Sequence, residues 1–425
     1  MQVSFLKAKK DNICIPVMAE SLKQLMADGV GGEEYAVCDI IELRIDYIKE
    51  DIIEETKKIL GYLKEIFPKK LFIVTYRTAV EGGMGDLGGI SEELFCDEYK
   101  KLILQLVKEV RCDFIDVEIN RGAHIVGEVA VEAHNRNIAV IGSYHNFKST
   151  PDDEEMIRVL KCIDSSEADV LKMAVMPEGE NDVARLMKVT SIATHMFDKP
   201  LITMSMGELG TISRVYGFLY GSSVTFGTAS AASAPGQINA LQLYKDMQIA
   251  GNIKIALIGF MGSGKSAVSD ALTSVLGIAC KDTDKEIVSK EGRSIPDIFE
   301  TDGEEYFRTV ETSVTKEILK SSEPMIVSCG GGVIKKEENR ELLKEYAVTC
   351  LLEAKPETIL ERVKGDTNRP LLKGKMNVED IDALMQERKS YYDMTAEVAV
   401  KTDNKSTTEI AVQILNEILM FIHKY

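Results

Sequence analysis

The sequence of 425 residues contains no tryptophan and only 6% aromatic residues. It also lacks any run of about 18 apolar residues, which argues against a membrane-spanning helix. The first residues have no long apolar segment of the kind a secretory signal requires, so we expect a cytoplasmic protein. Lysine and arginine number 51 against 68 aspartates and glutamates, and both halves of the chain are acidic. Without a basic patch, the sequence argues against nucleic acid or an anionic membrane as a partner.

Cysteine pairs with the spacing of a metal site are also missing. The eight cysteines are scattered and none forms a C-x-x-C pair, which predicts reduced thiols rather than a disulfide framework or a zinc site. A chain of this length exceeds what one hydrophobic core can serve, so we expect two or three domains.

Eight short apolar runs occur in the first 250 residues. They are apolar on both faces, as is typical of parallel strands covered by helices. They span residues 13–19, 40–46, 71–77, 114–119, 138–145, 169–176, 201–206 and 224–227. Helical spacing lies between most of them, for example over 95–110, and residues 236–249 can supply a last helix. A doubly wound sheet is an alternative, but the count favours a (β/α)8 TIM barrel over residues 1–250.

Polar side chains stand near the carboxyl ends of these strands, where barrel active sites are built. They include Glu118 and a lysine, Lys172, inside the apolar stretch DVLKMAVMP. A buried ammonium group costs several kcal/mol unless it is paired or loses its proton. A lysine that extends to the surface along apolar neighbours is the alternative reading.

The pattern restarts after residue 250 with an apolar strand over 253–260. It runs into GFMGSGKS (259–266), which fits the P-loop pattern and precedes a helical stretch. The backbone of such a loop surrounds a phosphate, Lys265 would reach the β- and γ-phosphates, and Ser266 would hold Mg²⁺. The sequence therefore predicts a nucleotide phosphate and Mg²⁺ as ligands of a second domain, a parallel sheet flanked by helices over residues 251–425. The loop alone fits a kinase, a switch GTPase or a motor.

Four further motifs follow the P-loop: KDTDKEI (281–287), GEEYFRTVE (303–311), VSCGGGV (327–333) and NRPLL (368–372). In this order they resemble shikimate kinase over about residues 252–425. The resemblance implies transfer of the ATP γ-phosphate to the 3-hydroxyl of shikimate, with Asp284 orienting or deprotonating that hydroxyl. It implies ATP contacts from Gly262, Ser263, Gly264, Lys265, Ser266, Ala267, Arg362 and the lid arginine Arg369. It implies shikimate contacts from Asp284, Arg308, Gly330, Gly331, Gly332 and Arg388, and metal contacts from Ser266 and Asp282.

Motifs of the first domain resemble the type I 3-dehydroquinate dehydratases over about residues 11–247. They are IELRID, TYRTAVEGG, GSYHNF, LKMAVMP, ITMSMGELGTISRV and SAPGQI. The resemblance implies that Lys172 forms a Schiff base without a cofactor, that His145 shuttles protons, and that Glu81 supports His145. It implies dehydroquinate contacts from Glu42, Arg44, Arg77, Arg214, Ser233, Gln237 and, as a pocket wall, Met206. Because a desolvated amine loses its proton more readily, we expect apolar neighbours around Lys172.

Together these features predict a bifunctional enzyme of the shikimate pathway that acts on 3-dehydroquinate and on shikimate. The two steps are not consecutive, so a separate shikimate dehydrogenase would have to act between them or dock. The resemblance suggests a homodimer formed through the barrel. The alternatives are a class I aldolase-like barrel fused to a kinase for another small alcohol, or to a nucleotide-binding regulatory module.

Overall fold

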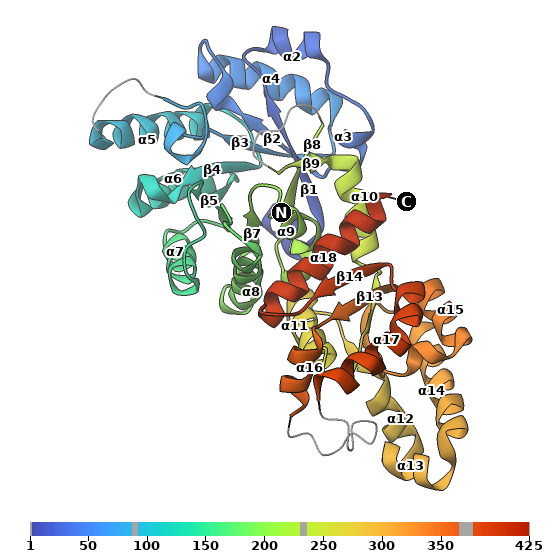
Figure 1. Cartoon of the computed structure of the whole chain (residues 1–425). Helices are drawn as coiled ribbons and strands as arrows, with labels where there is room; N and C mark the ends of the chain where they lie inside the picture. The colour runs from blue at the N-terminus through green and yellow to red at the C-terminus, as the bar shows by residue number, and fades with distance from the viewer. Residues whose placement is uncertain (1, 87–91, 230–235, 365–376, 425) are drawn as a thin grey trace. The chain divides into compact units, whose positions relative to one another are not determined.

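The computed structural model describes residues 2–86, 92–229, 236–364 and 377–424 (Figure 1). The chain forms two compact units, Met1–Gln248 and Ile249–Tyr425, and each contains a parallel sheet. Among the helices in the described ranges, none has an apolar stretch of the length that crossing a bilayer requires.

The strands of the first unit follow one another around a ring. Their order is β7-β6-β5-β4-β3-β2-β1-β8, with a two-residue β9 beside β8, and the eight predicted strands and the (β/α)8 barrel are confirmed. The strands are β1 (Asn12–Met18), β2 (Ile40–Arg44), β3 (Leu71–Thr75), β4 (Phe114–Glu118), β5 (Ala139–Asn146), β6 (Val170–Val175), β7 (Leu201–Ser205), β8 (Val224–Thr228) and β9 (Ile238–Asn239).

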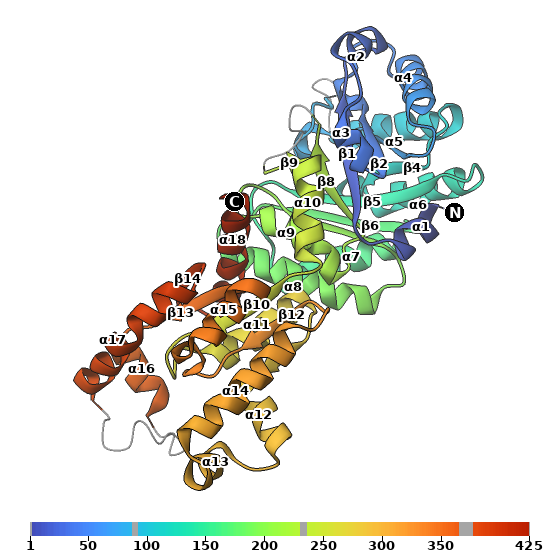
Figure 2. The same cartoon turned by 90° about the vertical axis from the view of Figure 1, so that its right-hand side faces the viewer.

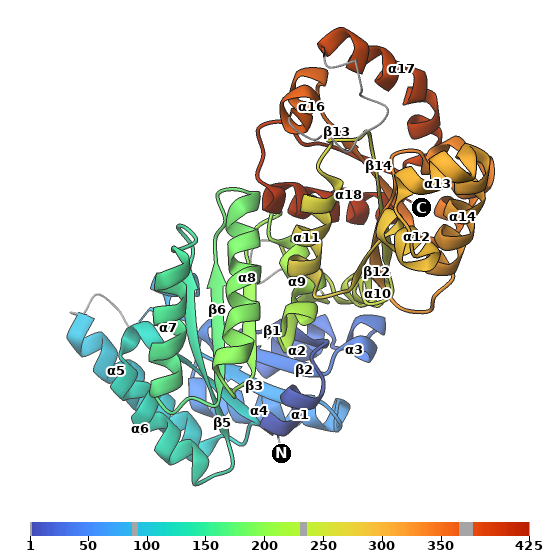
Figure 3. The same cartoon turned by 90° about the horizontal axis from the view of Figure 1, so that it is seen from below.

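Helices surround this ring, and Figure 3 shows α5 to α8 outside the strands. The α-helices are α1 (Gln2–Ala8), α2 (Leu22–Asp28), α3 (Glu33–Val37), α4 (Ile52–Ile66), α5 (Glu92–Glu109), α6 (Ala123–His134), α7 (Asp153–Ser165), α8 (Glu180–Met196), α9 (Thr211–Tyr216) and α10 (Ala240–Ala250). Short 3-10 helices follow three of the strands, η1 (Ile45–Tyr47), η2 (Ala79–Glu81) and η3 (Ile119–Arg121), and η4 (Gly217–Tyr220) follows α9.

The last predicted helix, over residues 236–249, begins later than expected. Ile238 and Asn239 extend along β8 as β9. The side-chain oxygen of Asn239 then accepts hydrogen bonds from the backbone N–H groups of Leu241 and Gln242. An asparagine in this position satisfies the first free N–H groups of a helix, so α10 starts directly after it.

The inner face of the barrel changes from apolar to polar along several strands, whereas on β7 it stays apolar with Ile202 and Met204. Side chains alternate between the two faces of a strand, so Phe114, Asp116 and Glu118 of β4 share one face. Phe114 belongs to a buried cluster with the inward residues of the other strands, among them Cys14, Ile40, Ile73, Ile141, Val170, Ile202 and Val224. This buried cluster fills the barrel interior below the polar residues at the carboxyl ends of the strands.

The ring closes between β7 and β8 with little regular pairing. One isolated parallel bridge joins Leu201 to Ser222. The backbone N–H of Thr203 donates to the Ser222 hydroxyl oxygen at 3.0 Å, and the N–H of Ser223 donates to the Leu201 carbonyl at 2.6 Å. A serine side chain therefore supplies part of the hydrogen bonding at this junction.

The second unit has the strand order β11-β12-β10-β13-β14, and helices flank this parallel sheet as predicted (Figures 1 and 2). The strands are β10 (Lys254–Ile258), β11 (Cys280–Asp282), β12 (Met325–Ser328), β13 (Val348–Glu353) and β14 (Val398–Lys401). The helices are α11 (Lys265–Leu276), α12 (Thr283–Glu291), α13 (Ile295–Thr301), α14 (Gly303–Leu319), η5 (Val333–Lys335), α15 (Glu337–Tyr346), α16 (Pro356–Val363), α17 (Val378–Thr395) and α18 (Thr407–Lys424). Because β12 and β13 lie on opposite sides of β10, the strand order reverses there, and open sheets of this kind bind ligands beyond the carboxyl end of that strand.

The packing of α7 against β5 generates a prediction about stability. A Cβ atom added at Gly142 would overlap Ile163 and lie 2.9 Å from the Cβ of Ala168. Gly142→Ala should therefore lower the free energy of unfolding of the barrel by about 1–3 kcal/mol. The matched control is Gly61→Ala, at an exposed position inside α4 where an added Cβ meets nothing within 4 Å. Because alanine favours a helix more than glycine does, this control should raise the free energy of unfolding by about 0.5–1 kcal/mol.

Hydrogen exchange of β5 peptides across a urea series would measure both variants. Equal exchange in Gly142→Ala and the unchanged protein would contradict the close packing of α7 on β5.

Candidate active sites

A buried lysine lies in the cavity at the carboxyl ends of the barrel strands. Lys172 on β6 is 3% exposed, and its Nζ donates a hydrogen bond to Asp116 Oδ2 at 3.0 Å. Glu42 Oε1 lies 3.6 Å from the same nitrogen, and the Phe226 ring centre lies 4.8 Å from it. The strand neighbours of Lys172 are buried and apolar, but the expectation of apolar surroundings is wrong for Nζ itself. A buried positive charge is tolerated when carboxylates compensate for it in this way.

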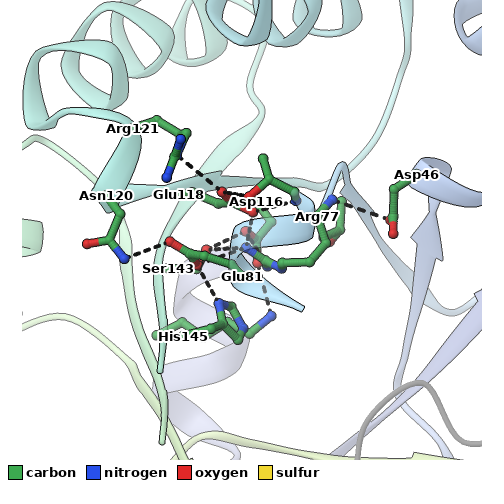
Figure 4. Close-up of polar contacts among 12 residues, drawn as sticks. Asp46, Arg77, Glu81, Asp116, Glu118, Asn120, Arg121, Ser143 and His145 are labelled. Atoms are coloured by element: carbon green, nitrogen blue, oxygen red, sulfur yellow. Dashed lines mark hydrogen bonds and ion pairs between the residues drawn. The ribbon is translucent and has the colours of Figure 1, made fainter. Parts of the chain in front are cut away.

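Asp116 on β4 joins Lys172 to a second buried cation. Its Oδ1 accepts hydrogen bonds from the Ser143 hydroxyl at 2.6 Å and from Arg77 at 2.8 Å. Arg77 also donates to Glu118 at 3.0 Å, and Figure 4 shows these side chains converging from neighbouring strands. Burial alone would raise the pKa of Asp116, but the positive charges of Arg77 and Lys172 hold it well below its usual value.

A carboxylate–imidazole pair lines the same cavity. His145 lies near the end of β5 and Glu81 in η2, with Nδ1 and Oε2 2.9 Å apart (Figure 4). Burial, followed by repulsion from Glu118, raises the pKa of Glu81 to about 8. Burial, followed by the charges of Arg77 and Lys172, brings the pKa of His145 well below its usual value. When ionised Glu81 accepts from Nδ1–H, the Nε2 atom of a neutral His145 is left to take a proton.

The segment that carries Glu81 is anchored by Asp46. Arg44 donates to both carboxylate oxygens of Asp46, at 2.9 and 2.8 Å. The same oxygens accept from the backbone N–H groups of Arg77 at 3.3 Å and Met84 at 3.0 Å. Asp46 therefore fixes both ends of the turn between these residues, and with it the position of Glu81.

Arg214 enters the cavity from α9 and is 1% exposed. Its guanidinium contacts the Phe226 carbonyl at 3.5 Å and the Met204 sulfur at 3.7 Å. Burial lowers the pKa of Arg214 to about 10, so it remains a cation at neutral pH and suits an anionic group of a ligand.

One cavity brings together the described residues that the sequence assigned to the barrel site. Its lining includes Glu42, Arg44, Arg77, Glu81, His145, Lys172, Met206, Arg214 and Gln237. Ser233 lies outside the described residues. Among the residues with direct contacts to this set that the sequence analysis missed are Asp46, Thr75, Asp116, Asn120, Ser143 and Phe226. The alternation of β4 was the available signal for Asp116, since it shares a face with Glu118.

The predicted P-loop connects β10 to α11 in the second unit. Gly259, Gly262 and Gly264 have φ angles of 153°, 81° and 98°, which side chains other than glycine rarely adopt. Lys265 starts α11, and its Nζ donates to the Gly259 carbonyl at 2.8 Å. The predicted ATP contacts over 262–267 therefore occupy one loop and the first turn of the helix that follows it.

Arg362 on α16 also reaches this loop. Its guanidinium donates to the Ser263 carbonyl at 3.2 Å and to the Thr402 hydroxyl at 3.0 Å. The predicted nucleotide contact thus lies beside the loop. Arg369, the predicted lid arginine, lies outside the described residues.

Asp282 ends β11 and caps the following helix. Its Oδ1 accepts from the backbone N–H groups of Asp284 at 3.0 Å and Lys285 at 3.2 Å. Its Oδ2 accepts from the Ser328 hydroxyl at 2.9 Å. These bonds fix α12 against the end of β12 and hold the backbone of Asp284 in place.

The three glycines after β12 contact the other predicted shikimate residues. A Cβ at Gly330 would lie 2.5 Å from Asp284 Oδ1, and a Cβ at Gly332 would overlap the guanidinium of Arg308. Arg388 donates to the Gly331 carbonyl at 3.2 Å. The glycine sequence therefore leaves room for the side chains of an aspartate and an arginine.

Arg308 itself is held by carboxylates on its own helix. It donates to Glu311 at 2.8 Å and to Glu304 at 3.1 Å, which lie three and four positions away on the same helix. The buried Glu311 carboxylate compensates for the arginine charge and limits its rotation.

Two family models match the chain. The type I 3-dehydroquinase model covers residues 13–254, more than half of the chain, and the shikimate kinase model covers residues 261–419. These matches favour the dehydratase and kinase predictions over the aldolase-like and regulatory alternatives.

Similar proteins of both kinds are known. The 3-dehydroquinate dehydratase of Clostridium novyi (strain NT) is 35% identical over 243 residues, which are 57% of this chain and 93% of that protein. The type I 3-dehydroquinate dehydratase of Clostridium difficile, solved with covalently modified comenic acid, is 35% identical over 57% of this chain and 92% of its own, with a TM-score of 0.51. The shikimate kinase of Acinetobacter baumannii in complex with shikimate is 35% identical over 41% of this chain and 96% of its own, with a TM-score of 0.39. For the second unit, the assignment rests on the family model.

The chain therefore belongs to the type I 3-dehydroquinase family and, with its shikimate kinase domain, is a fusion of two shikimate-pathway enzymes, a dehydratase and an ATP-using kinase.

Proposed function

We propose that Lys172 carries the dehydratase reaction by forming a Schiff base with the ketone of 3-dehydroquinate. The observation that carries this proposal is the position of Nζ in the cavity, 3.0 Å from Asp116 and 3.6 Å from Glu42. Nζ first gives up a proton, the resulting amine attacks the carbonyl carbon, and the carbinolamine hydroxyl takes up that proton and leaves as water, so that a positively charged iminium remains. The two carboxylates that now compensate for the lysine charge would stabilise that iminium.

His145 then acts first as a base and afterwards as an acid. Its Nε2 takes the proton from C2, the electrons of that C–H bond move into the iminium, and an enamine forms. The enamine expels the C1 hydroxyl, which leaves as water with the proton that His145 returns. Hydrolysis of the remaining iminium releases 3-dehydroshikimate and restores Lys172. This sequence needs no cofactor.

The other cavity residues would bind the substrate in the barrel. Arg214 would bind the substrate carboxylate as a buried cation. The hydroxyl groups would be held by the predicted contacts Glu42, Arg44, Arg77, Gln237 and Ser233, with Met206 as a pocket wall.

In the kinase, we propose that Asp284 orients the 3-hydroxyl of shikimate for attack on the γ-phosphate. Arg308 and Arg388 would bind the shikimate carboxylate by paired hydrogen bonds. Lys265 would contact the β- and γ-phosphates, Arg362 the nucleotide, and Arg369 the transferring phosphate.

The residues proposed for Mg²⁺ are Ser266 and Asp282. Magnesium is usually held by one or two carboxylates and substrate phosphates while it keeps several waters, and a hydroxyl with one carboxylate fits this small set. When bound, the ion would offset negative charge on the phosphates. Chelation should stop phosphate transfer and leave dehydration unchanged, whereas transfer without a divalent ion would contradict this assignment.

We also propose that the domains divide near residue 250, as 1–250 and 251–425, which the two compact units support. A homodimer through the barrel and a separate shikimate dehydrogenase remain part of the proposal. Light scattering of the full chain tests the dimer, and a mass equal to one chain would exclude it. Co-purification with a shikimate dehydrogenase tests docking.

The Schiff base generates a prediction about the dehydratase. Borohydride should reduce the iminium and attach the substrate carbon skeleton to Lys172, and peptide mapping would locate it. Lys172→Ala should give no adduct. Its dehydration kcat should fall by at least about a thousandfold, because the covalent step is lost. An adduct on another residue, or none with the unchanged protein, would contradict the mechanism. Phosphate transfer serves as the control and should be unaffected.

Another prediction about the dehydratase concerns pH. Glu81 must be ionised to accept from His145 Nδ1–H, and the pKa of Glu81 is raised to about 8. The dehydration kcat should therefore be low at pH values below the pKa of Glu81 and should rise as the pH passes through it. The profile should show no separate step at the usual pKa of histidine, because the pKa of His145 is well below its usual value. Glu81→Gln keeps an acceptor without an ionisable proton, so its profile should lose this rise, and a rise that persists would point to another group.

A prediction about the kinase concerns its glycines. Gly332→Ala should displace Arg308, whose NH2 atom would lie 2.6 Å from the new Cβ. We expect kcat/KM for shikimate to fall roughly tenfold to a hundredfold, as small misplacements in an active site do, with little change in KM for ATP. Lys265→Ala is the comparison, since it should abolish phosphate transfer and leave dehydration intact. An unchanged KM and kcat for shikimate in Gly332→Ala would contradict the role of Arg308.

A further inference from the structure

A third side chain joins the Glu81–His145 pair. The amide Nδ2 of Asn120 donates a hydrogen bond to Glu81 Oε1 at 2.8 Å, while Oε2 of the same carboxylate lies 2.9 Å from His145 Nδ1. Asn120 lies in η3 directly after β4, so the three residues come from three separate segments of the barrel mouth (Figure 4).

The geometry gives each oxygen of the Glu81 carboxylate its own partner. An NH₂ group can only donate, so Oε1 must accept from it. Rotation of the carboxylate would break this bond, and the bond therefore keeps Oε2 directed at His145. The orientation of Glu81 in turn decides which nitrogen of the imidazole carries the proton.

The charges around Glu81 make a donor at this position important. Glu118 and Asp116 on β4 repel the negative charge of Glu81, while Arg77 after β3 attracts it from 3.6 Å. His145 faces it from β5. Arg77 also donates to Asp116 and Glu118 at 2.8 and 3.0 Å, so its charge is shared among several carboxylates. The Asn120 amide is closer to Glu81 than Arg77 is.

We propose that Asn120 is a positioning residue for dehydration, which stabilises and orients the Glu81 carboxylate so that His145 presents Nε2 to the substrate. This inference rests on the proposed roles of Glu81 and His145. It adds a residue that acts through another and does not touch the substrate.

The test compares the pH dependence of dehydration in full-length variants. Asn120 is exposed, so Asn120→Ala leaves no cavity in the core. Loss of a hydrogen bond to a charged group should move the rise of kcat by about one pH unit toward alkaline pH. At neutral pH, kcat should then fall roughly tenfold, and at pH values above the shifted rise it should return to the unchanged rate.

Two further variants complete the comparison. Asn120→Asp has the same shape, but its ionised side chain cannot donate and adds a negative charge, so its shift should equal or exceed that of Asn120→Ala. Asn135→Ala, at the exposed end of α6, is the control and should keep the original profile. An unshifted rise in Asn120→Ala, an equal loss at every pH, or a normal profile in Asn120→Asp would overturn the inference.

The proposed function can fail separately. Absence of the borohydride adduct on Lys172, or a rise of kcat that survives in Glu81→Gln, would contradict the mechanism itself. If both of those results are as expected and Asn120→Ala still behaves normally, only the role of Asn120 is wrong.

Discussion

Two buried cations share the carboxylate of Asp116, and the active face of the barrel depends on this ion cluster. Lys172 and Arg77 would each cost several kcal/mol in this position if they were unpaired. Their common partner lies on β4, while Arg77 follows β3 and Lys172 lies on β6, so the cluster links strands as well as charges. Substrate therefore meets side chains whose orientation is already fixed, which is the condition for electrostatic stabilisation of a transition state.

Much of this barrel could be predicted from the sequence because its inner face follows a period of two. All eight strands lie within a few residues of the expected ranges, and apolar residues precede polar ones along the inward faces of several strands, such as β4. Contacts across the ring were harder to predict. The alternation of β4 places Asp116 on the inward face, but nothing local to β4 shows that its carboxylate meets Lys172 on β6. For the same reason the surroundings of Nζ were expected to be apolar, since the sequence neighbours of Lys172 are apolar but its spatial neighbours include carboxylates.

The kinase motifs were easier to place, because most of their chemistry lies within short segments. The P-loop runs from strand to helix as its pattern predicts, and Arg308 meets Glu311 three positions away on α14. The glycines at 330 and 332 were predicted to contact shikimate. The structure gives them a second task, because they also make room for Asp284 and Arg308. A pattern of glycines shows where space is needed and leaves open which side chain fills it.

The pairing of β1 with β8 has a consequence for how the protein is made. Asn12 is the register partner of Val224, so the ring cannot close until the ribosome has synthesised the chain past β8. The P-loop and the second sheet come later in the sequence, beginning with β10. Domains generally fold as units, with the N-terminal one first during synthesis, and the barrel can therefore be complete before the kinase exists. One round of translation then delivers both enzymes in equal numbers, so their ratio in the cell does not depend on separate control of two genes.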